Sequence, residues 1–193
     1  MINLHVILAS VRPGRVGKAV ADWFLPIANA DDRFQVELVD LLELDLPFMD
    51  EPEMPGRRAY TKEHTKAWSA TVDRADAFVF VTPEYNATPA PALKNAIDFL
   101  YHEWAGKPVG FVSYGGVWAG ARAVQALKPT LTQLSMMPLA AQVPIPGVSG
   151  LLDEDGSFAG TDRYERSAAG MLDELAIWAD ALTPIRERAR AGA

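Results

Sequence analysis

The chain has 193 residues, of which 49% are hydrophobic and 22% charged, and its formal net charge is −7 at pH 7. This composition is typical of a globular protein with a sizeable core, and the acidic excess argues against nucleic acid as a partner, because phosphate binding needs clustered Lys and Arg. Cysteine is absent from the sequence, which excludes disulfides, thiolate nucleophiles and iron–sulfur ligation.

Apolar runs alternate with helical patterns along the chain. In chain order they predict strand 2–9, helix 18–30, strand 34–41, helix 61–75, strand 77–82, helix 91–104, strand 107–114, helix 120–137, strand 138–145 and helix 163–182, which Thr183-Pro184 bends or restarts. The irregular stretch between 42 and 60 is long for a compact domain, which suggests a functional flap. No apolar run approaches the ~20 residues that span a bilayer, and the N-terminus lacks signal-peptide features. We therefore expect one domain over residues 1–193, cytoplasmic and without membrane insertion.

This alternation predicts an α/β fold. Strands that are apolar throughout are typical of a parallel sheet with helices on both faces. Five strands in this length favour a doubly wound, flavodoxin-like sheet with the order 2-1-3-4-5. Ligands of such folds bind beyond the carboxyl ends of the strands, so the loops after strands 1, 3 and 4 are the candidate site.

The loop after the first strand is SVRPGRVGK (10–18), which places Ser10, Arg12, Arg15 and Lys18 at the start of a helix. Unsatisfied N–H groups and the positive end of the helix dipole make such a place an anion-binding site, best suited to phosphate. The loop matches neither Walker A nor GxGxxG. The alternative is a solvated basic first turn.

The loop after the third strand is TPEYNATPAPALKN (82–95). Thr88 and Pro89 suit the start of the next helix, but they leave Pro-Glu-Tyr-Asn unexplained. Pro83 fixes the backbone, so the turn can present N–H and C=O groups to the edge of a flat ligand. The alternative is a rigid turn with Glu84 in water.

The loop after the fourth strand begins SYGG (113–116). Gly115 and Gly116 allow close backbone approach or a positive φ, and Tyr114 and Trp118 supply aromatic surface. The alternative is a tight turn with two core aromatics. The three loops together suit a planar heterocycle that carries a phosphate, as flavin mononucleotide (FMN) does.

These motifs resemble those of the NAD(P)H-dependent FMN reductase family, which includes quinone, azo-dye and chromate reductases on a flavodoxin-like fold. The resemblance covers about residues 3 to 143 and rests on ASVR (9–12), PEYNATPAPALKNAID (83–98), and SYGG (113–116) with GARA behind it. The chain departs from the family pattern at Ala9, where Gly is usual, and at Ala90, where Pro is expected.

The resemblance implies a role for each motif. It implies that the FMN phosphate is held by Ser10, Arg12, Arg15, Val16 and Gly17. It implies that the isoalloxazine edge is lined, largely through backbone groups, by Pro83, Glu84, Tyr85, Asn86 and Ala87. Beside the ring or its pyrimidine end it places Ser113, Tyr114, Gly115 and Gly116. It also implies that helix 91–104 forms a dimer surface.

The expected function is that of an FMN-dependent oxidoreductase that passes hydride from NADPH or NADH through flavin N5 to a quinone, free flavin or similar small acceptor. No catalytic side chain is required, and His5, His64 and His102 show no metal-ligand spacing. The expected partners are a small-molecule acceptor, a second or further copies in a homodimer or homotetramer, and a flavin-dependent monooxygenase. The alternative is a flavodoxin-type electron carrier serving a partner enzyme, although the hydroxyl-rich loop of that group is absent here. A receiver domain would need acidic residues at the end of the first strand and an Asp at the end of the third, and the segments ILASVR and FVFVTPE offer neither.

Overall fold

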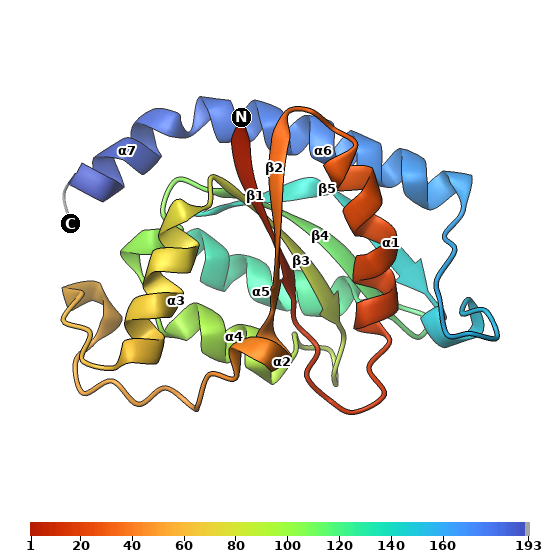
Figure 1. Cartoon of the computed structure of the whole chain (residues 1–193), viewed down its shortest axis with the longest axis horizontal. Coiled ribbons are helices and arrows are strands. Elements are labelled where there is room, and N and C mark those ends of the chain that lie inside the picture. The colour runs from red at the N-terminus through yellow and green to blue at the C-terminus, as the bar shows by residue number, and fades with distance from the viewer. Residues whose placement is uncertain (192–193) are drawn as a thin grey trace.

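The computed structural model describes residues 1–191, in which five parallel strands form one sheet (Figure 1). The strands are β1 (Ile2–Leu8), β2 (Phe34–Asp40), β3 (Ala77–Pro83), β4 (Pro108–Gly115) and β5 (Met137–Pro146). Their order is β2-β1-β3-β4-β5, which confirms the predicted topology. The central strand β3 is buried along its whole length, as expected of a continuous apolar run covered on both faces.

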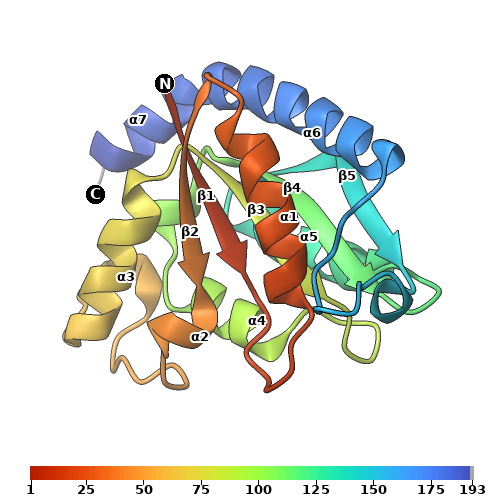
Figure 2. The same ribbon diagram turned by 45° about the vertical axis from the view of Figure 1, so that its right-hand side comes forward.

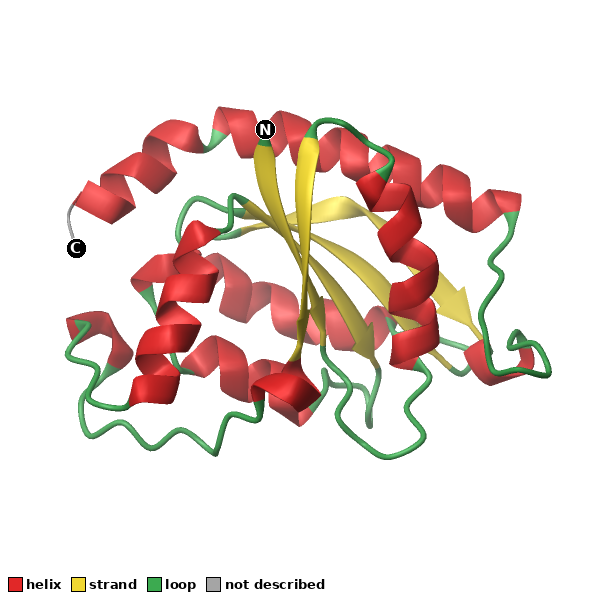
Figure 3. Ribbon diagram, viewed as in Figure 1, coloured by secondary structure: helices red, strands yellow, loops and turns green. Residues whose placement is uncertain are grey.

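Helices cover the two faces of this sheet (Figure 3). One face packs against α1 (Gly17–Asn29) and α6 (Asp162–Ala181). The other packs against α3 (Glu63–Arg74), α4 (Pro91–Asp98) and α5 (Ala121–Gln133). A hydrophobic cluster lies on each face. Successive strand residues point to opposite faces, so Val79 packs in the cluster with α1 and α6, and Phe80 packs in the cluster with α3, α4 and α5. Within the described chain, no helix combines the length and apolar character needed to cross a membrane. Both hydrophobic clusters pack on this one sheet. The single domain over residues 1–193 stays a prediction.

The predicted helix 91–104 is too long. Helix α4 ends at Asp98, and a separate 3-10 turn, η2, spans His102–Trp104. In a continued helix the N–H of Tyr101 would bond the carbonyl of Ile97. Instead the Tyr101 N–H donates to the Glu103 carboxylate at 3.3 Å, and the Trp104 indole N–H donates to Ile97 at 3.1 Å. The helical hydrogen bond before it, from the Leu100 N–H to Ala96, is also missing, because the Leu100 N–H donates to the Ile97 carbonyl at 3.3 Å and the Trp68 indole N–H donates to the Ala96 carbonyl at 2.8 Å. The helix therefore stops.

The stretch from 42 to 60 is tied down. It includes the end of the short helix α2 (Leu41–Leu44) and the 3-10 turn η1 (Pro55–Arg57). The Met49 N–H donates to the Asn95 side chain at 3.1 Å, and His102 Nε2 lies 2.8 Å from the Gly56 carbonyl. None of this stretch lines the cavity described below. The structure therefore gives no support to its interpretation as a flap.

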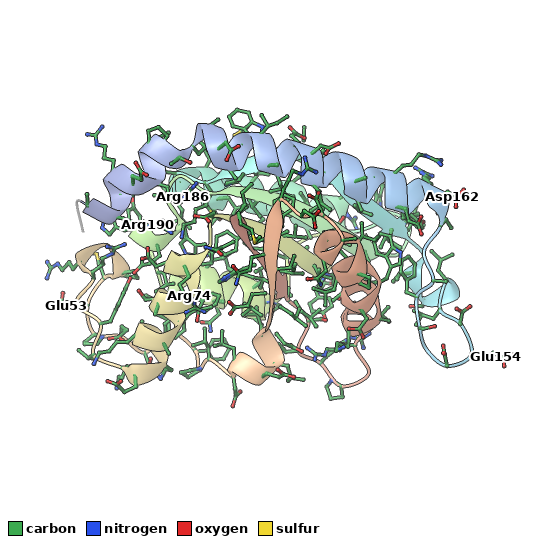
Figure 4. All side chains as sticks on the ribbon, turned by 45° about the horizontal axis from the view of Figure 1, so that its top comes forward. Glu53, Arg74, Glu154, Asp162, Arg186 and Arg190 are labelled. Atoms are coloured by element: carbon green, nitrogen blue, oxygen red, sulfur yellow. The ribbon has the colours of Figure 1, made fainter. Side chains whose placement is uncertain are left out.

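The last helix, α7 (Thr183–Ala191), restarts at Thr183 as the sequence predicts. Arg186 links it to the loops that precede β3 and β4, because its Nε lies 3.1 Å from Asp76 Oδ1 and its Nη1 donates to the Gly106 carbonyl at 3.3 Å. Figure 4 shows Arg186 toward the same end of the molecule as Arg74, away from Glu154.

Lys107 gives the fold a specific pH dependence. Its side chain is buried, and its Nζ donates to the Val72 carbonyl at 2.6 Å. Burial, assisted by the charge of Arg190, lowers the pKa of Lys107 to about 7 from its ordinary 10.5. Between these values the unfolded chain binds more protons than the native one, so the free energy of unfolding rises as the pH increases.

We expect urea unfolding between pH 7 and pH 9.5 to show this rise, with a slope below the one-proton limit of ~1.4 kcal/mol per pH unit. Lys107→Met should flatten the slope because it removes the titrating group. Equal slopes in the two proteins would contradict the prediction.

Candidate functional site

A cavity of about 360 Å³ opens at the carboxyl edge of the sheet, where the connecting loops gather (Figure 2). Its volume lies within the range of ~300–1,000 Å³ that is usual for small-molecule sites. It is lined by Ser10, Arg12, Arg15, Val16, Pro83, Glu84, Tyr85, Tyr114, Gly115, Gly116, Gly147, Val148 and Ser149. The three predicted loops therefore meet, and a fourth segment after β5 joins them.

Four predicted site residues do not line this cavity: Gly17, Asn86, Ala87 and Ser113. Ser113 is buried, and its hydroxyl donates to the Ala119 carbonyl at 2.8 Å. It thus holds the loop after β4 in place. Ligand contact by these four residues stays a prediction.

In the loop after β1, the two arginines have different surroundings. The Arg15 guanidinium donates to both carboxylate oxygens of Asp40 at the end of β2, and to the Ser10 carbonyl at 2.7 Å. Burial alone would raise the pKa of Asp40, but the hydrogen bonds from Arg15 and from the Leu42 N–H, together with the charges of Arg15 and Lys18, outweigh it and the pKa is lowered. Arg12 is exposed and has no ion pair within residues 1–191. Arg15 therefore shapes the loop, and Arg12 offers a cation that an anionic ligand can meet.

Two buried hydroxyls lie at the start of α1. Ser10 is 2% exposed and Tyr114 5%, and neither Ser10 Oγ nor Tyr114 OH has a hydrogen-bond partner among the described residues. Val16 provides no side-chain cap, and the first turn of α1 contains no acidic residue. Unpaired buried hydroxyls and free helix N–H groups are complementary to a phosphate. The residues present thus fit the phosphate end of FMN.

Gly17 is required at this point for steric reasons. A Cβ atom there would lie 2.2 Å from Tyr114 OH and 2.4 Å from Ser10 Oγ. Only glycine allows both hydroxyls to approach the first residue of the helix.

After β3, Glu84 is held by Arg122 of α5. Arg122 Nε donates to its carboxylate at 2.6 Å and the Arg122 N–H at 3.2 Å, so only 6% of the Glu84 side chain is exposed. The alternative that Glu84 lies in water is therefore wrong. The Glu84 N–H donates to the Tyr114 carbonyl at 3.2 Å, which joins the loops after β3 and β4.

Asn86 and Ala87 form a tight turn beside the cavity. Tyr85 and Thr88 exchange two backbone hydrogen bonds of 3.0 Å, and φ is +51° at Asn86 and +66° at Ala87. Two consecutive positive φ values indicate a type I′ turn, which favours Asn followed by Gly. Alanine in the second position is strained.

We expect Ala87→Gly to raise the free energy of unfolding by about 0.5–1 kcal/mol, since relief of left-handed strain exceeds the entropy that glycine adds to the unfolded chain. Ala70→Gly, in the exposed interior of α3, is the matched control and should lower it by about 1 kcal/mol. Urea unfolding measures both; a loss of stability in each would refute the strain.

The two glycines at the end of β4 have different surroundings, and only Gly115 allows close approach. A Cβ at Gly115 would lie 3.3 Å from the Gly120 nitrogen, whereas no atom of the described residues lies within 4 Å of one at Gly116. Neither has a positive φ, so that part of the prediction is wrong; the positive values fall at Ala119 and Gly120. Gly116 leaves space in the cavity wall for a ligand.

The segment Gly147, Val148 and Ser149 lines the cavity without having been predicted from the sequence. The Gly147 N–H donates to the Gly116 carbonyl at 3.1 Å, which places this segment against the loop after β4. A signal was available, because Pro146-Gly147 marks a turn at the carboxyl end of a fifth parallel strand.

Sheet order and an edge cavity beside β1, β3 and β4 define a flavodoxin-like α/β protein. The family model described as NADPH-dependent FMN reductase matches residues 2–150. The chain belongs to this family, which confirms the resemblance and the oxidoreductase class predicted from the motifs.

Relatives cover different shares of the chain. An NAD(P)H-dependent FMN reductase of Schizosaccharomyces pombe is 48% identical over 125 residues, which are 64% of this chain and 62% of that relative. The NAD(P)H-dependent FMN reductase ntnL of a Nectria species is 37% identical over 190 residues, 94% of this chain and 89% of the relative. The solved structure of FerB, a flavoenzyme NAD(P)H:(acceptor) oxidoreductase from Paracoccus denitrificans, matches with a TM-score of 0.74 at 23% identity, over 94% of this chain and 98% of its own, and supports the fold.

Proposed function

We propose that this chain binds FMN in the edge cavity and passes hydride from NADPH or NADH to a quinone, free flavin or similar small acceptor. The observation that carries the proposal is the pair of buried, unpartnered hydroxyls, Ser10 Oγ and Tyr114 OH, at the uncapped start of α1 within the cavity. When bound, FMN supplies the hydride chemistry, and the protein supplies position and electrostatics.

The loop after β1 binds the phosphate end in this proposal. Arg12 and the N-terminal N–H groups of α1 supply positive potential. Arg15 keeps the loop in shape through Asp40. The pKa of Tyr114 is raised to about 12 by burial, so its hydroxyl remains a donor at neutral pH.

The loops after β3 and β4 hold the ring. Pro83 and Tyr85 form one wall, and the open space at Gly116 admits a flat group. Backbone N–H groups at this edge can stabilise negative charge on a reduced ring. Glu84 is committed to Arg122, so it is not assigned as a proton donor.

A homodimer or homotetramer is also proposed. It is supported by Phe48 and Met54, which are 86% and 67% exposed on the tied-down stretch that Asn95 of α4 holds. Large exposed apolar side chains on a fixed surface favour association. Sedimentation velocity of the unaltered chain and of Phe48→Asp tests the dimer; a monomer in the unaltered chain would refute it.

A flavin-dependent monooxygenase that receives reduced flavin and a cytoplasmic location remain predictions from the sequence. The function itself is tested by a visible spectrum of the purified protein and by anaerobic mixing of the FMN-loaded protein with NADPH and with NADH. We expect at least one nucleotide to bleach the flavin absorbance. A protein that takes up FMN but is bleached by neither would be better explained as an electron carrier.

A further inference from the structure

We infer that Tyr114 belongs to the phosphate subsite of the cavity, through its hydroxyl, and not to the ring subsite in which the family resemblance places it. The inference rests on the proposed function, because it assigns one side chain within the proposed FMN site. The group that the Tyr114 hydroxyl would contact is the phosphate of FMN, a monoester dianion.

The Tyr114 side chain reaches from β4 to the start of α1. Tyr114 lies on β4, beside Pro83 of β3 in the sheet register, but its side chain packs in the cluster that contains α1. Its hydroxyl reaches the start of that helix, 2.2 Å from where a Cβ of Gly17 would be. The side chain therefore spans from the strand that faces the ring to the helix end that faces the phosphate.

The hydrogen-bonding capacity of two buried hydroxyls also indicates the phosphate subsite. Tyr114 OH and Ser10 Oγ flank Gly17 beside each other, and beyond this mutual contact neither meets a hydrogen-bond partner within the described chain. Unpaired buried hydroxyls are costly, so a ligand oxygen that accepts from both relieves two penalties at once. The raised pKa of Tyr114 keeps this donor protonated.

The positive charge around the start of α1 favours an anionic group there. The first turn of α1 carries no acidic residue, and Arg12 and Arg15 lie in the loop before it. Arg15 is neutralised by Asp40, whereas Arg12 and the helix dipole are not compensated by an ion pair among residues 1–191. A dianion gains more here than the neutral polar edge of a ring.

The test compares FMN with riboflavin, which has the same ring and no phosphate. Dissociation constants are measured by quenching of flavin fluorescence for the unaltered chain, Tyr114→Phe, Ser10→Ala and the control Tyr85→Phe, a second tyrosine that lines the cavity, from the loop after β3. We expect Tyr114→Phe to weaken FMN binding about tenfold, the effect of one hydrogen bond to a charged group, and to change riboflavin binding less than about twofold. Ser10→Ala should also weaken the binding of FMN more than that of riboflavin. Tyr85→Phe should not discriminate between the two flavins.

A second readout is the ³¹P resonance of bound FMN, which should shift in Tyr114→Phe and stay in place in Tyr85→Phe. Equal weakening of both flavins by Tyr114→Phe would overturn the inference in favour of a ring contact, and unchanged FMN binding in a variant with unchanged thermal unfolding would overturn it as well. An unaltered chain that binds neither flavin would instead refute the proposed function, and the inference with it.

Discussion

Glu103→Ala is expected to lower the free energy of unfolding by about 3–5 kcal/mol, the usual cost of removing one member of a buried, hydrogen-bonded charge cluster. The Glu103 carboxylate is buried and accepts from Ser69 Oγ at 2.7 Å and from Tyr60 OH at 3.0 Å. Arg58 Nε lies 3.5 Å from it. Alanine would leave these donors and a half-buried guanidinium without an acceptor. Urea unfolding at pH 7 measures the loss.

Two variants control this prediction. Glu103→Gln keeps the shape and one acceptor, so it should cost less than alanine. Glu53→Ala removes an exposed carboxylate that Arg57 pairs with at 2.6 Å, and it should cost no more than about 1 kcal/mol. A loss of similar size for Glu103→Ala and Glu53→Ala would show that the cluster does not stabilise the fold.

Gly17→Ala is expected to weaken FMN binding by at least about tenfold and to lower the free energy of unfolding by about 1–3 kcal/mol, the usual cost of overpacking. The added methyl group would lie 2.2 Å from Tyr114 OH and 3.0 Å from Leu8 Cδ1, so the tyrosine or the helix must move. Fluorescence titration with FMN and urea unfolding measure the two effects.

The matched control is Gly170→Ala, also a glycine in a helix. Gly170 lies on the exposed side of α6, and no described atom is within 4 Å of its would-be Cβ. Alanine should therefore stabilise the protein there by about 0.5–1 kcal/mol through helix propensity alone. If Gly17→Ala also raised the free energy of unfolding, the close approach of the two hydroxyls to Gly17 would not make glycine necessary there.

The sheet could be predicted because its signal is local. Each strand is a short apolar run bounded by turns, and the strand order follows from the fold class. The end of α4 could not be predicted in this way. It depends on the local hydrogen bonds of Tyr101 and Trp104 and on the Trp68 indole N–H of α3, which reaches the Ala96 carbonyl only in the folded chain.

The candidate site was predictable as far as motifs mark it. Loops that follow parallel strands meet at one edge, so three motifs sufficed to bring Ser10, Pro83 and Gly116 together. The ion pairs around them were hidden, because Arg15 meets Asp40 only through the register of β1 with β2, and Glu84 meets Arg122 only across two loops. Side chains that a motif assigns to a ligand can thus be bound by the protein itself.

The family match ends at residue 150, but residues after it also contribute to the hydrophobic core. Helix α6 lies wholly beyond that point, and it buries Tyr164, Ala168, Met171, Leu172, Leu175, Ala176 and Ala179. A fragment cut at 150 would keep every motif of the candidate site and would leave one face of β4 and β5 open to water. The smallest fragment of this enzyme that keeps its core is therefore longer than the segment that matches the family. A shortened or fused version has to retain α6, although none of its residues lines the cavity.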